Sequence, residues 1–470
     1  MEEQVPHYFL INADETTSQA MKNITRNNGN VVFVIDHDQN LKGSITDGDI
    51  RRSILNGVNI NDPVTNVMNH NPTTISNSAD IQEVYDLFEK SEIAISHIPA
   101  TNSEGKIVNI HQRDKLHYKL PKSVSELFSH KPLAKIAKHT LITGGAGYIG
   151  THLARILLEK GNKVTILDKF VFGTNSVKNL KNNLKNNNSL RIIEGDVSNV
   201  ADIMKAIDGV DSVVHLAEIV GDPACSVDPK TTQQVNFLST SVLAQVCKYL
   251  HIPRFVYASS CSVYGASEGK SLLNERSKLN PVSLYARMKI ESEKVLRNMM
   301  DDVFSPTILR FATVFGLSDR MRFDLVVNIL SAKAATDGKI TVFGGDQWRP
   351  LVHVEDVALA IVKTLESPLE KVRGEVFNVG SKENNHTIND IGVMVKDAFP
   401  EAELVIQEKD VDKRNYCVDF HKIESALGFK AQKSVRDGIK EIKQAFKDQK
   451  FTDYTKEEFS NVKTYSLREQ

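Results

Sequence analysis

The sequence predicts an α/β protein built on a mostly parallel sheet with helices on both faces, preceded by a smaller α+β repeat. From Thr140 onward, short β-branched runs alternate with amphipathic helical segments, which is typical of a doubly wound sheet. The first 120 residues carry a weak internal repeat at an offset of about 64. The length of 470 residues leaves room for two or three domains.

Six runs are expected to form the strands of the main sheet. They are residues 140–145, 163–168, 191–196, 212–217, 254–260 and 306–311. Beyond about Phe315 the alternation loosens, which predicts a smaller mixed region toward the C-terminus. The tail, 446–470, is polar and is expected to be peripheral.

Each copy of the N-terminal repeat reads strand, helix, strand, polar turn, strand and helix. The turns are Asp38-Gln39-Asn40 in the first copy and Asn102-Ser103-Glu104-Gly105 in the second. A single copy could hardly cover its own sheet, so we expect two copies, 5–60 and 64–118, to pack face to face. The Lys-rich stretch 119–137 that follows is expected to be a linker.

The composition excludes several classes of function. With 58 Lys and Arg against 59 Asp and Glu, the chain has no basic excess for nucleic acid or an anionic membrane. It has no apolar run long enough for a membrane span, and its acidic N-terminus does not resemble a signal peptide. The four cysteines never adopt a CxxC spacing, which argues against a disulfide framework and a zinc site. We therefore expect a cytoplasmic protein without a bound metal.

A glycine-rich loop follows the first expected strand of the main sheet. Gly144, Gly147 and Gly150 have the spacing GxxGxxG in TGGAGYIG. The first two would let the backbone approach a pyrophosphate at a helix N-terminus, and the third would allow close packing of helix on strand. The spacing alone is also compatible with a turn that binds nothing.

Two acidic residues at the ends of the next strands favour a dinucleotide. Asp168 lies at the distance expected for the acid that binds the adenosine ribose, and its charge would repel the extra phosphate of NADP. NAD is thus the expected cofactor, although Lys169 leaves NADP open. Asp196 is placed to reach the adenine or to serve as a turn residue. Leu216 and Ala217 would line the cofactor.

Tyr285 and Lys289 are four residues apart and therefore share one helix face. For a tyrosine to act as a base near neutral pH, its pKa must fall from about 10 by some 3 units, and a neighbouring ammonium favours this. Ser260 follows the fifth strand run, at the edge where such sheets bind ligands. His215 is expected to be a packed strand-end residue.

Together these motifs resemble those of the extended short-chain dehydrogenases/reductases. Residues 138–445 are similar to the NAD-dependent nucleotide-sugar epimerase/dehydratase group, of the UDP-glucose 4-epimerase type. The motifs TGGAGYIG, HLA, VNFLST, SSCSVYG, YARMK, RFATVFG and WRPLVHVEDVA follow in the family's order. The resemblance implies an NAD-binding Rossmann fold with a smaller C-terminal substrate-binding region, and it implies a homodimer.

The resemblance also implies roles for individual residues. Tyr285 would be the base, Lys289 would hold the nicotinamide ribose, and Ser260 would contact the reacting sugar hydroxyl. The residues implied around NAD are Gly144, Gly147, Tyr148, Ile149, Gly150, Asp168, Asp196, Val197, Leu216, Ala217, Asn236, Tyr285 and Lys289. Those implied around the nucleotide sugar are Ser260, Asn328, Arg349 and Arg414.

Departures from the family pattern bear on the reaction. Dehydratases of the group carry an acidic pair, or at least a Glu, directly after the hydroxyl residue, whereas Cys261 and Ser262 stand there in this chain. Dehydration is therefore disfavoured, and reversible oxidation at C4 is favoured. Thr313 replaces the Asn of many epimerases, which suggests an uncommon sugar nucleotide. A 4-dehydrogenase or ketoreductase, or a non-catalytic nucleotide sensor, are the alternatives.

The N-terminal repeat resembles a tandem CBS pair, a regulatory module that commonly binds adenine nucleotides. Thr46 and Asp49, in GSITDGDI, match the residues that hold phosphate and ribose. The second copy reads NIHQRD, without a Ser or Thr three residues before the acid, so one nucleotide site is expected rather than two. A pair that only dimerises or spaces the enzyme is the alternative.

Overall fold

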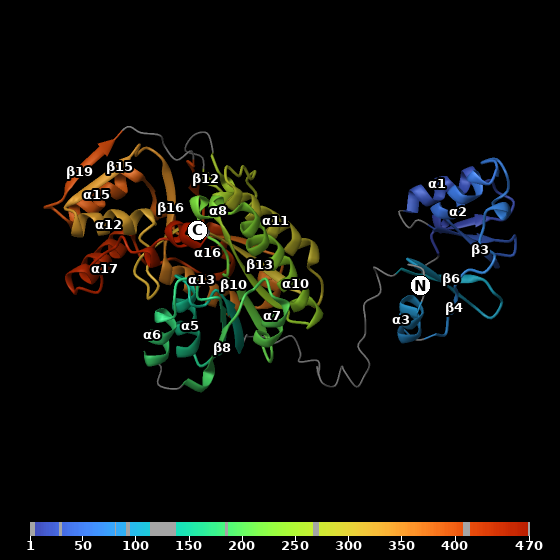
Figure 1. Cartoon of the computed structure of the whole chain (residues 1–470), viewed down its shortest axis with the longest axis horizontal. Coiled ribbons are helices and arrows are strands. Elements are labelled where there is room, and N and C mark those ends of the chain that lie inside the picture. Colours follow the sequence, from blue (N-terminus) through green and yellow to red (C-terminus); the bar gives the residue numbers. More distant parts are fainter. Residues whose placement is uncertain are drawn as a thin grey trace. The chain divides into compact units, whose positions relative to one another are not determined.

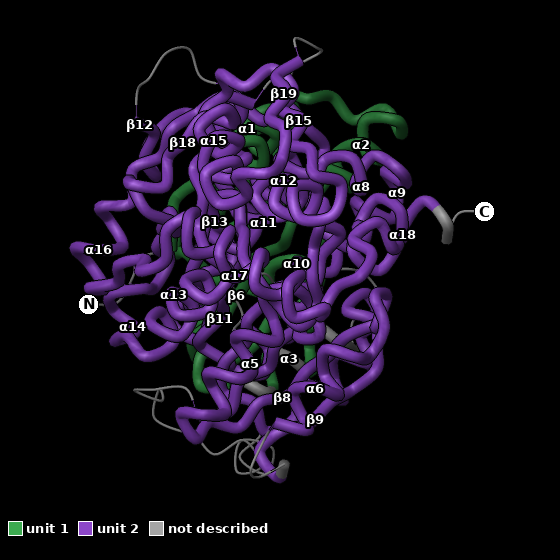
Figure 2. Tube along the Cα trace, turned by 90° about the vertical axis from the view of Figure 1, so that its left-hand side faces the viewer, with its two compact units in different colours: residues 1–132 green, residues 133–470 purple. Residues whose placement is uncertain are grey.

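The computed structural model describes residues 5–27, 31–79, 81–90, 95–112, 138–183, 187–266, 272–407 and 414–468. The chain divides into two units, Met1–Pro132 and Leu133–Gln470 (Figure 1; green and purple in Figure 2). The expected linker, 119–137, and the last helix of the second repeat lie outside the described residues.

The first unit contains the expected repeat. Its first copy comprises β1 (Leu10–Asn12), α1 (Thr17–Asn27), β2 (Val31–Ile35), β3 (Leu41–Thr46) and α2 (Asp47–Leu55). The second copy comprises β4 (Ile75–Ser76), α3 (Ile81–Lys90), β5 (His97–Thr101) and β6 (Ile107–Gln112). In each copy the first two strands are parallel and the last two antiparallel. The expected element order is thus confirmed for all described elements.

The two copies meet where their polar turns lie. The amide of Leu41 donates to the carbonyl of Gly105 at 3.0 Å, and the backbones of Asn40 and Lys106 form an isolated antiparallel β-bridge. Each copy has its own apolar cluster, with Ile45 central in the first and Ile98 in the second, both fully buried. Turn-to-turn contact therefore joins two small cores within this unit.

The second unit is built on a seven-stranded parallel sheet. Its strands, in spatial order, are β17 (Val376–Val379), β13 (Ser305–Phe311), β11 (Arg254–Ser260), β10 (Ser212–His215), β7 (His139–Thr143), β8 (Lys163–Asp168) and β9 (Leu190–Glu194). Six were expected from the sequence, whereas the four-residue strand β17 was too short to give a pattern. Strand order reverses at β7, which creates the crevice where such sheets bind ligands.

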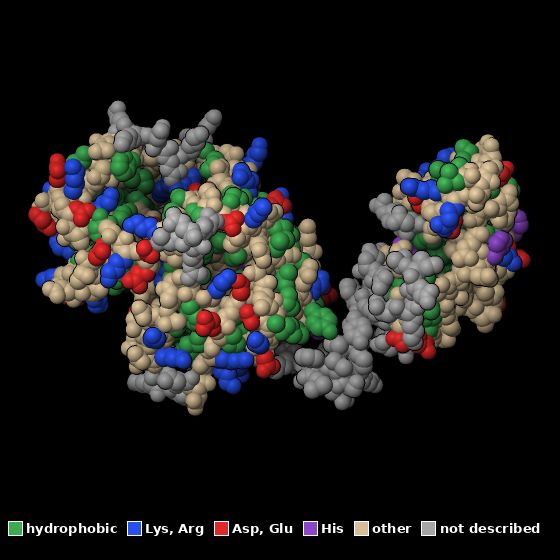
Figure 3. All heavy atoms as spheres, in the orientation of Figure 1, with side chains coloured by type: hydrophobic (Ala, Val, Ile, Leu, Met, Phe, Trp, Pro, Cys, Tyr) green, Lys and Arg blue, Asp and Glu red, His purple; other side chains and the backbone are tan. Residues whose placement is uncertain are grey.

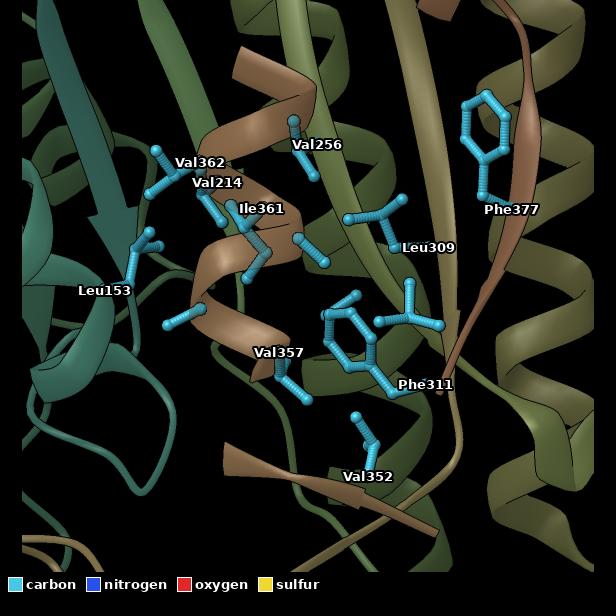
Figure 4. Close-up of a cluster of buried hydrophobic side chains, with 14 of the residues drawn as sticks. Leu153, Val214, Val256, Leu309, Phe311, Val352, Val357, Ile361, Val362 and Phe377 are labelled. Carbon is cyan, nitrogen blue, oxygen red and sulfur yellow. The ribbon is translucent and has the colours of Figure 1, made fainter. Parts of the chain in front are cut away.

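Helices cover both faces of this sheet. On one face lie α5 (Gly150–Glu159), α6 (Asn175–Asn183) and α13 (Val354–Glu366), whose apolar residues join one core cluster. On the other lie α7 (Val200–Ala206), α10 (Ser239–Tyr249) and α11 (Leu284–Met299). Figure 4 shows Ile361 of α13 beside Val256 of β11, and Val357 of α13 beside Phe311 of β13. The expected doubly wound architecture is therefore confirmed.

The C-terminal part forms the expected smaller mixed region. Strands β15 (Lys339–Phe343) and β19 (Glu403–Gln407) pair, and they share a core with α12 (Val326–Thr336), α15 (Ile388–Ala398) and α17 (Val435–Lys447). A second small sheet contains β14 (Thr313–Phe315), β16 (Trp348–His353) and β18 (Asn385–Thr387). The short elements are α8 (Asp222–Val227), α9 (Pro229–Gln233), α14 (Leu369–Val372), α16 (His421–Leu427), β12 (Leu272–Leu273) and β20 (Cys417–Val418).

The expectation of a peripheral C-terminal tail was wrong. The last described helix after α17 is α18 (Asn461–Arg468). Phe451, Tyr454 and Phe459 surround the buried ring of Phe323 at centroid distances of 5.3, 6.2 and 5.4 Å. Aromatic residues spaced several positions apart in a polar segment anchor it, because each buries a large apolar area.

On the face in Figure 3, Lys and Arg side chains are interspersed with Asp and Glu. No helix among the described residues is long and apolar enough to cross a membrane.

Candidate active site

The glycine-rich loop joins β7 to α5 at the centre of the sheet. Gly144 has a φ of +70°, and a Cβ there would lie 2.8 Å from the backbone nitrogen of Ala217. A Cβ on Gly150 would lie 2.6 Å from the carbonyl oxygen of Gly144. A Cβ on Gly147 would meet only that same oxygen, at 3.0 Å. Two glycines thus permit the tight turn, while the third leaves backbone open to the pocket.

This loop opens into a large pocket that collects most of the expected site residues. Of the residues implied for NAD, all except Asn236 line it: Gly144, Gly147, Tyr148, Ile149, Gly150, Asp168, Asp196, Val197, Leu216, Ala217, Tyr285 and Lys289. Ser260 and Arg414 line it as well, whereas Asn328 and Arg349 do not.

The two acids expected at the adenosine end are both ordered by local contacts. Asp168 accepts hydrogen bonds from the amides of Ala146 at 2.9 Å and Phe170 at 2.8 Å. Burial raises the pKa of Asp168, and these amides oppose the rise. Asp196 accepts from Lys169 at 2.7 Å. The Lys169 ammonium, which was the reason for keeping NADP as a possible cofactor, is thus paired with the Asp196 carboxylate.

Tyr285 and Lys289 occupy one buried face of α11. Ser283 caps the helix by accepting from the amide of Ala286 at 3.2 Å, which places Tyr285 in the first turn. The Lys289 ammonium lies 5.4 Å from the centroid of the Tyr285 ring, and the two residues are 3% and 8% exposed. Burial raises the pKa of Tyr285, while hydrogen bonding to Ser260 lowers it. The structure therefore brings the three expected catalytic residues together.

Glu218 is a fourth residue at this centre, and sequence reasoning missed it. Its carboxylate contacts the Lys289 ammonium and accepts from the Tyr257 hydroxyl at 2.8 Å. The Glu218 side chain is 2% exposed, and the pKa of its carboxyl is raised by burial, with Lys289 opposing. Lys289 also donates to the carbonyl of Ala258. A signal existed, since Glu218 directly follows HLA at the carboxyl end of β10.

The two residues after Ser260 cannot act as an acid pair. Cys261 is 1% exposed, its thiol donates to the carbonyl of Arg310 at 3.3 Å, and burial raises the pKa of that thiol. It does not line the pocket. Ser262 does line the pocket, and its buried hydroxyl has no hydrogen-bond partner among the described residues.

Two implied ligand residues, Asn236 and Asn328, instead support the walls of the site. Asn236 lies in a π-helical turn, Gln234–Leu238, and bonds both the amide and the carbonyl of Ile219, at 2.9 and 2.8 Å. Asn328 accepts from the amide of Gly316 at 3.0 Å and donates to the Tyr148 hydroxyl at 3.1 Å. Asn236 and Asn328 therefore hold backbone that borders the pocket.

The two arginines implied for the nucleotide sugar lie side by side. Arg349 is 5% exposed and donates to the carbonyls of Trp348, at 2.9 Å, and of Arg414. Arg414 lines the pocket and pairs with Asp222 at 3.2 Å. Only Arg414 thus reaches the pocket directly, and Arg349 fixes the backbone that carries it.

His215 has the packing role that the sequence favoured. It is fully buried and bonds the hydroxyls of Thr143 at 2.7 Å and Thr240 at 2.9 Å. Burial lowers its pKa to about 3, so the ring is neutral and links β10 to β7 and α10.

The tail supplies pocket residues that the sequence did not suggest. Asn461 and Tyr465 of α18 line the pocket, as do Arg320 and Phe172. The ring of Tyr465 stands edge-on to Phe172 at 6.0 Å. These contacts close one side of the pocket with residues from both ends of the domain.

In the first unit, Thr46 and Asp49 form a capping box at the start of α2. Thr46 donates its amide to the Asp49 carboxylate at 2.8 Å and accepts from the Asp49 amide at 3.2 Å. Arg52 also donates to Asp49, at 2.7 Å. The pair thus has a structural role, and nucleotide binding there stays a prediction.

A glycine-rich loop, an acid at the end of the next strand, and a buried Tyr, Lys and Ser meet in one pocket, which is the arrangement expected of a dinucleotide-dependent enzyme. Residues 140–380 match the NAD dependent epimerase/dehydratase family, and residues 4–56 and 64–110 match the CBS domain. The chain therefore belongs to the NAD dependent epimerase/dehydratase family and carries a CBS domain pair.

Individual relatives agree with this assignment. An uncharacterised UDP-glucose epimerase of Bacillus subtilis, YtcB, is 30% identical over 309 residues, which are 64% of this chain and 95% of that protein. The UDP-glucuronic acid 4-epimerase from Bacillus cereus, solved with UDP-glucuronic acid and NAD, is 27% identical with a TM-score of 0.60, over 66% of this chain and 99% of that one.

A dehydratase is nearly as similar in structure. The dTDP-glucose 4,6-dehydratase DesIV from Streptomyces venezuelae, solved with NAD and TYD, is 25% identical with a TM-score of 0.59, over 66% of this chain and 98% of that one. The expected Rossmann fold and NAD as cofactor are confirmed, and the glycine-rich loop fits that dinucleotide. The choice between epimerase and dehydratase rests on the residues of the site.

Proposed function

We propose that this enzyme is a nucleotide-sugar epimerase that acts at C4 through a 4-keto sugar. The observation that carries the proposal is the convergence of Tyr285, Lys289 and Ser260 on the pocket of the glycine loop. The buried thiol of Cys261, which points to a backbone carbonyl, supports epimerisation over dehydration because neither of the two residues that follow Ser260 is an acid that could protonate a leaving water.

The buried residues would divide the work of removing a proton from the C4 hydroxyl. The Tyr285 oxygen takes the proton, and Ser260 orients the sugar oxygen by a hydrogen bond. Because burial and the Glu218 carboxylate both disfavour a phenolate at Tyr285, the Lys289 ammonium, 5.4 Å from the ring centroid, is the cation that would stabilise it. NAD, held by the loop of Gly144, Gly147 and Gly150 and by Asp168, would supply the hydride acceptor for the oxidation at C4 and the hydride donor for the reduction of the 4-keto sugar.

The pocket wall on the substrate side suits a nucleotide diphosphate. Arg414 presents a guanidinium whose backbone is fixed by Arg349, and a guanidinium pairs well with a diphosphate. The names of the relatives favour UDP-hexoses, since YtcB is named a UDP-glucose epimerase and the Bacillus cereus structure holds UDP-glucuronic acid.

The test is Tyr285→Phe with UDP-, GDP-, dTDP- and CDP-sugars and the co-purified cofactor. Wild type should invert one sugar at C4, seen by NMR, without lasting absorbance from reduced nicotinamide. Tyr285→Phe should lose turnover by at least about 100-fold while NAD stays bound. The matched control is Tyr249→Phe, at a tyrosine that is 65% exposed on α10.

Two results would overturn this assignment. An unchanged turnover rate in Tyr285→Phe would show that Tyr285 is not the base. Lasting accumulation of reduced nicotinamide with no inverted sugar would show a 4-dehydrogenase instead.

We further propose that the CBS pair binds an adenine nucleotide at Thr46 and Asp49 and so regulates the enzyme. The support is the match of 4–56 and 64–110 to the CBS domain together with the ordered turn before α2. Calorimetry of the full chain with AMP, ADP and ATP should give a Kd that Asp49→Asn weakens and Asp47→Asn leaves unchanged. Equal binding by both variants would exclude this site. A cytoplasmic location and a homodimer stay predictions.

A further inference from the structure

Arg320 is a buried arginine in the pocket that neither the expected catalytic set nor the expected substrate set contains. It lies in the loop between β14 and α12 and is 7% exposed. Its guanidinium carbon stands 3.6 Å from the centroid of the Phe172 ring, and Nη2 donates to Asn461 Oδ1 at 2.7 Å. A ring and an amide thus hold the group rigidly in place.

The guanidinium forms no ion pair with a carboxylate of the described residues, although Asp168 and Asp324 attract it from a greater distance. Its Nε makes no hydrogen bond there. The nearby carboxylate of Asp324 is occupied by a bidentate pair with Arg322, at 2.9 and 3.0 Å. Asp168 is occupied by two backbone amides. Burial, with Arg322 adding to it, lowers the pKa of Arg320 to about 9.

A buried cation without a partner costs folding free energy, so its presence at the wall of a ligand pocket calls for an anionic ligand. The pocket that Arg320 lines also contains Gly147, Asp168 and Phe172, which belong to its cofactor side. A phosphate oxygen in the pocket would accept a hydrogen bond from the Arg320 Nε, which has no partner among the described residues.

We propose that Arg320 binds a diphosphate in this pocket. Because Arg320 lies near Asp168 and Phe172, on the cofactor side, this diphosphate is the pyrophosphate of the dinucleotide. The shared chemistry is a diphosphate, which the nucleotide sugar also carries. The proposal rests on the dinucleotide pocket of the proposed function but not on the reaction at C4.

Asn461 of helix α18 fixes the position of the Arg320 guanidinium. Asn461 donates its side chain to the carbonyl of Val220 at 2.8 Å and its backbone amide to Asp324 at 3.0 Å, while accepting from Arg320. Asn461 is 5% exposed and lies beyond the residues that match the family, 140–380. A segment outside the family's shared part thus positions a cation inside the shared pocket.

The test is calorimetric binding to Arg320→Gln protein stripped of cofactor, with NAD, ADP-ribose, adenosine and UDP as probes. NAD and ADP-ribose should each bind about 10- to 100-fold more weakly than to wild type, as expected for a lost charge-assisted contact. The affinity for adenosine should be unchanged. Arg320→Lys keeps the charge and should lose less affinity than Arg320→Gln.

Thermal unfolding of the ligand-free protein separates binding from structure. Arg320→Gln keeps a donor for Asn461 and removes a buried charge, so its Tm should equal or exceed that of wild type. The control is Arg155→Gln, at a surface arginine paired with Glu159, which should change neither affinity nor Tm.

Three outcomes would overturn the proposal. A lower Tm with weaker binding of adenosine as well would show a structural role. Weaker binding confined to UDP would overturn the cofactor-side assignment and place the diphosphate on the substrate. Unchanged affinity of Arg320→Gln for every probe would show that Arg320 binds no diphosphate. Because these assays need no turnover, a failed C4 epimerase assay would leave their result readable.

Discussion

Replacing Lys289 by methionine should destabilise the second unit far more than replacing a surface lysine would. The substitution leaves the buried Glu218 carboxylate without its cationic partner. Lys289 and Glu218 are 3% and 2% exposed and in contact. Two unit charges about 4 Å apart at an effective dielectric constant of about 20 attract by about 4 kcal/mol. Breaking a buried pair by removing one partner costs about 3–5 kcal/mol, which is the loss expected for Lys289→Met.

Adding Glu218→Gln should restore most of that loss. The glutamine can still accept from Tyr257, and no charge is left buried, so the double variant should lie within about 1–2 kcal/mol of wild type. The coupling free energy should therefore be at least about 2 kcal/mol. The sign of the pH effect follows from burial, which raises the pKa of Glu218. In Lys289→Met the folded state then binds more protons than the unfolded state, so destabilisation should grow as pH rises above the ordinary glutamate pKa of 4.5.

Urea unfolding followed by tryptophan fluorescence measures these values. The chain has one tryptophan, Trp348 on β16, so the signal reports the second unit alone. Lys294→Met is the matched control, because Lys294 pairs with Glu291 on the same helix at 62% and 46% exposure and should cost less than about 0.5 kcal/mol. If the losses of Lys289→Met and Glu218→Gln simply add in the double variant, the pair is not coupled and the reasoning fails.

Two further sets of variants test the steric demand of the glycine-rich loop and the loss of folding stability at acidic pH. Gly144→Ala places a Cβ 2.8 Å from the backbone of Ala217 at a φ of +70°, whereas Gly161→Ala, at a φ of +81°, meets nothing within 4 Å. Gly161→Ala should cost about 1–2 kcal/mol and Gly144→Ala about 1–3 kcal/mol more in the same urea assay, and equal losses would contradict the steric reading. Burial opposes ionisation of Glu441, but hydrogen bonding to and charge attraction by His353 and Lys433 prevail and hold the pKa of Glu441 at about 2. Because that pKa is lowered on folding, wild type should lose stability as pH falls from about 4.5 to 2, and Glu441→Gln should lose less over the same range; parallel pH curves would exclude the effect.

Much of the fold and part of the site were predictable because their signals are local. The β-branched run Lys163–Asp168 and the amphipathic helix after Gly150 follow from the sequence, since strand and helix periods are read within a few residues. Tyr285 and Lys289 were predictable for the same reason, because a spacing of four fixes a common helix face.

Contacts between distant residues were not predictable in this way. Glu218 is paired with Lys289 from another element, and nothing near HLAE in the sequence indicates the partner. The tail was expected to be peripheral, yet Asn461 bonds Arg320 across 141 positions. Arg349 matched a ligand position, but its side chain holds the carbonyl of Arg414. Burial patterns show that a side chain faces inward but not which side chain it meets.

By itself, the sequence determined the doubly wound sheet, the glycine turn, the Tyr and Lys spacing and the absence of an acid after Ser260, because each depends on neighbours along the chain. Only the tertiary structure decided which charges are compensated: Lys289 meets Glu218, while Arg320 meets no described carboxylate. The physical reason is that the energy of a buried charge depends on every group within a few ångströms, and folding brings those groups from distant parts of the chain.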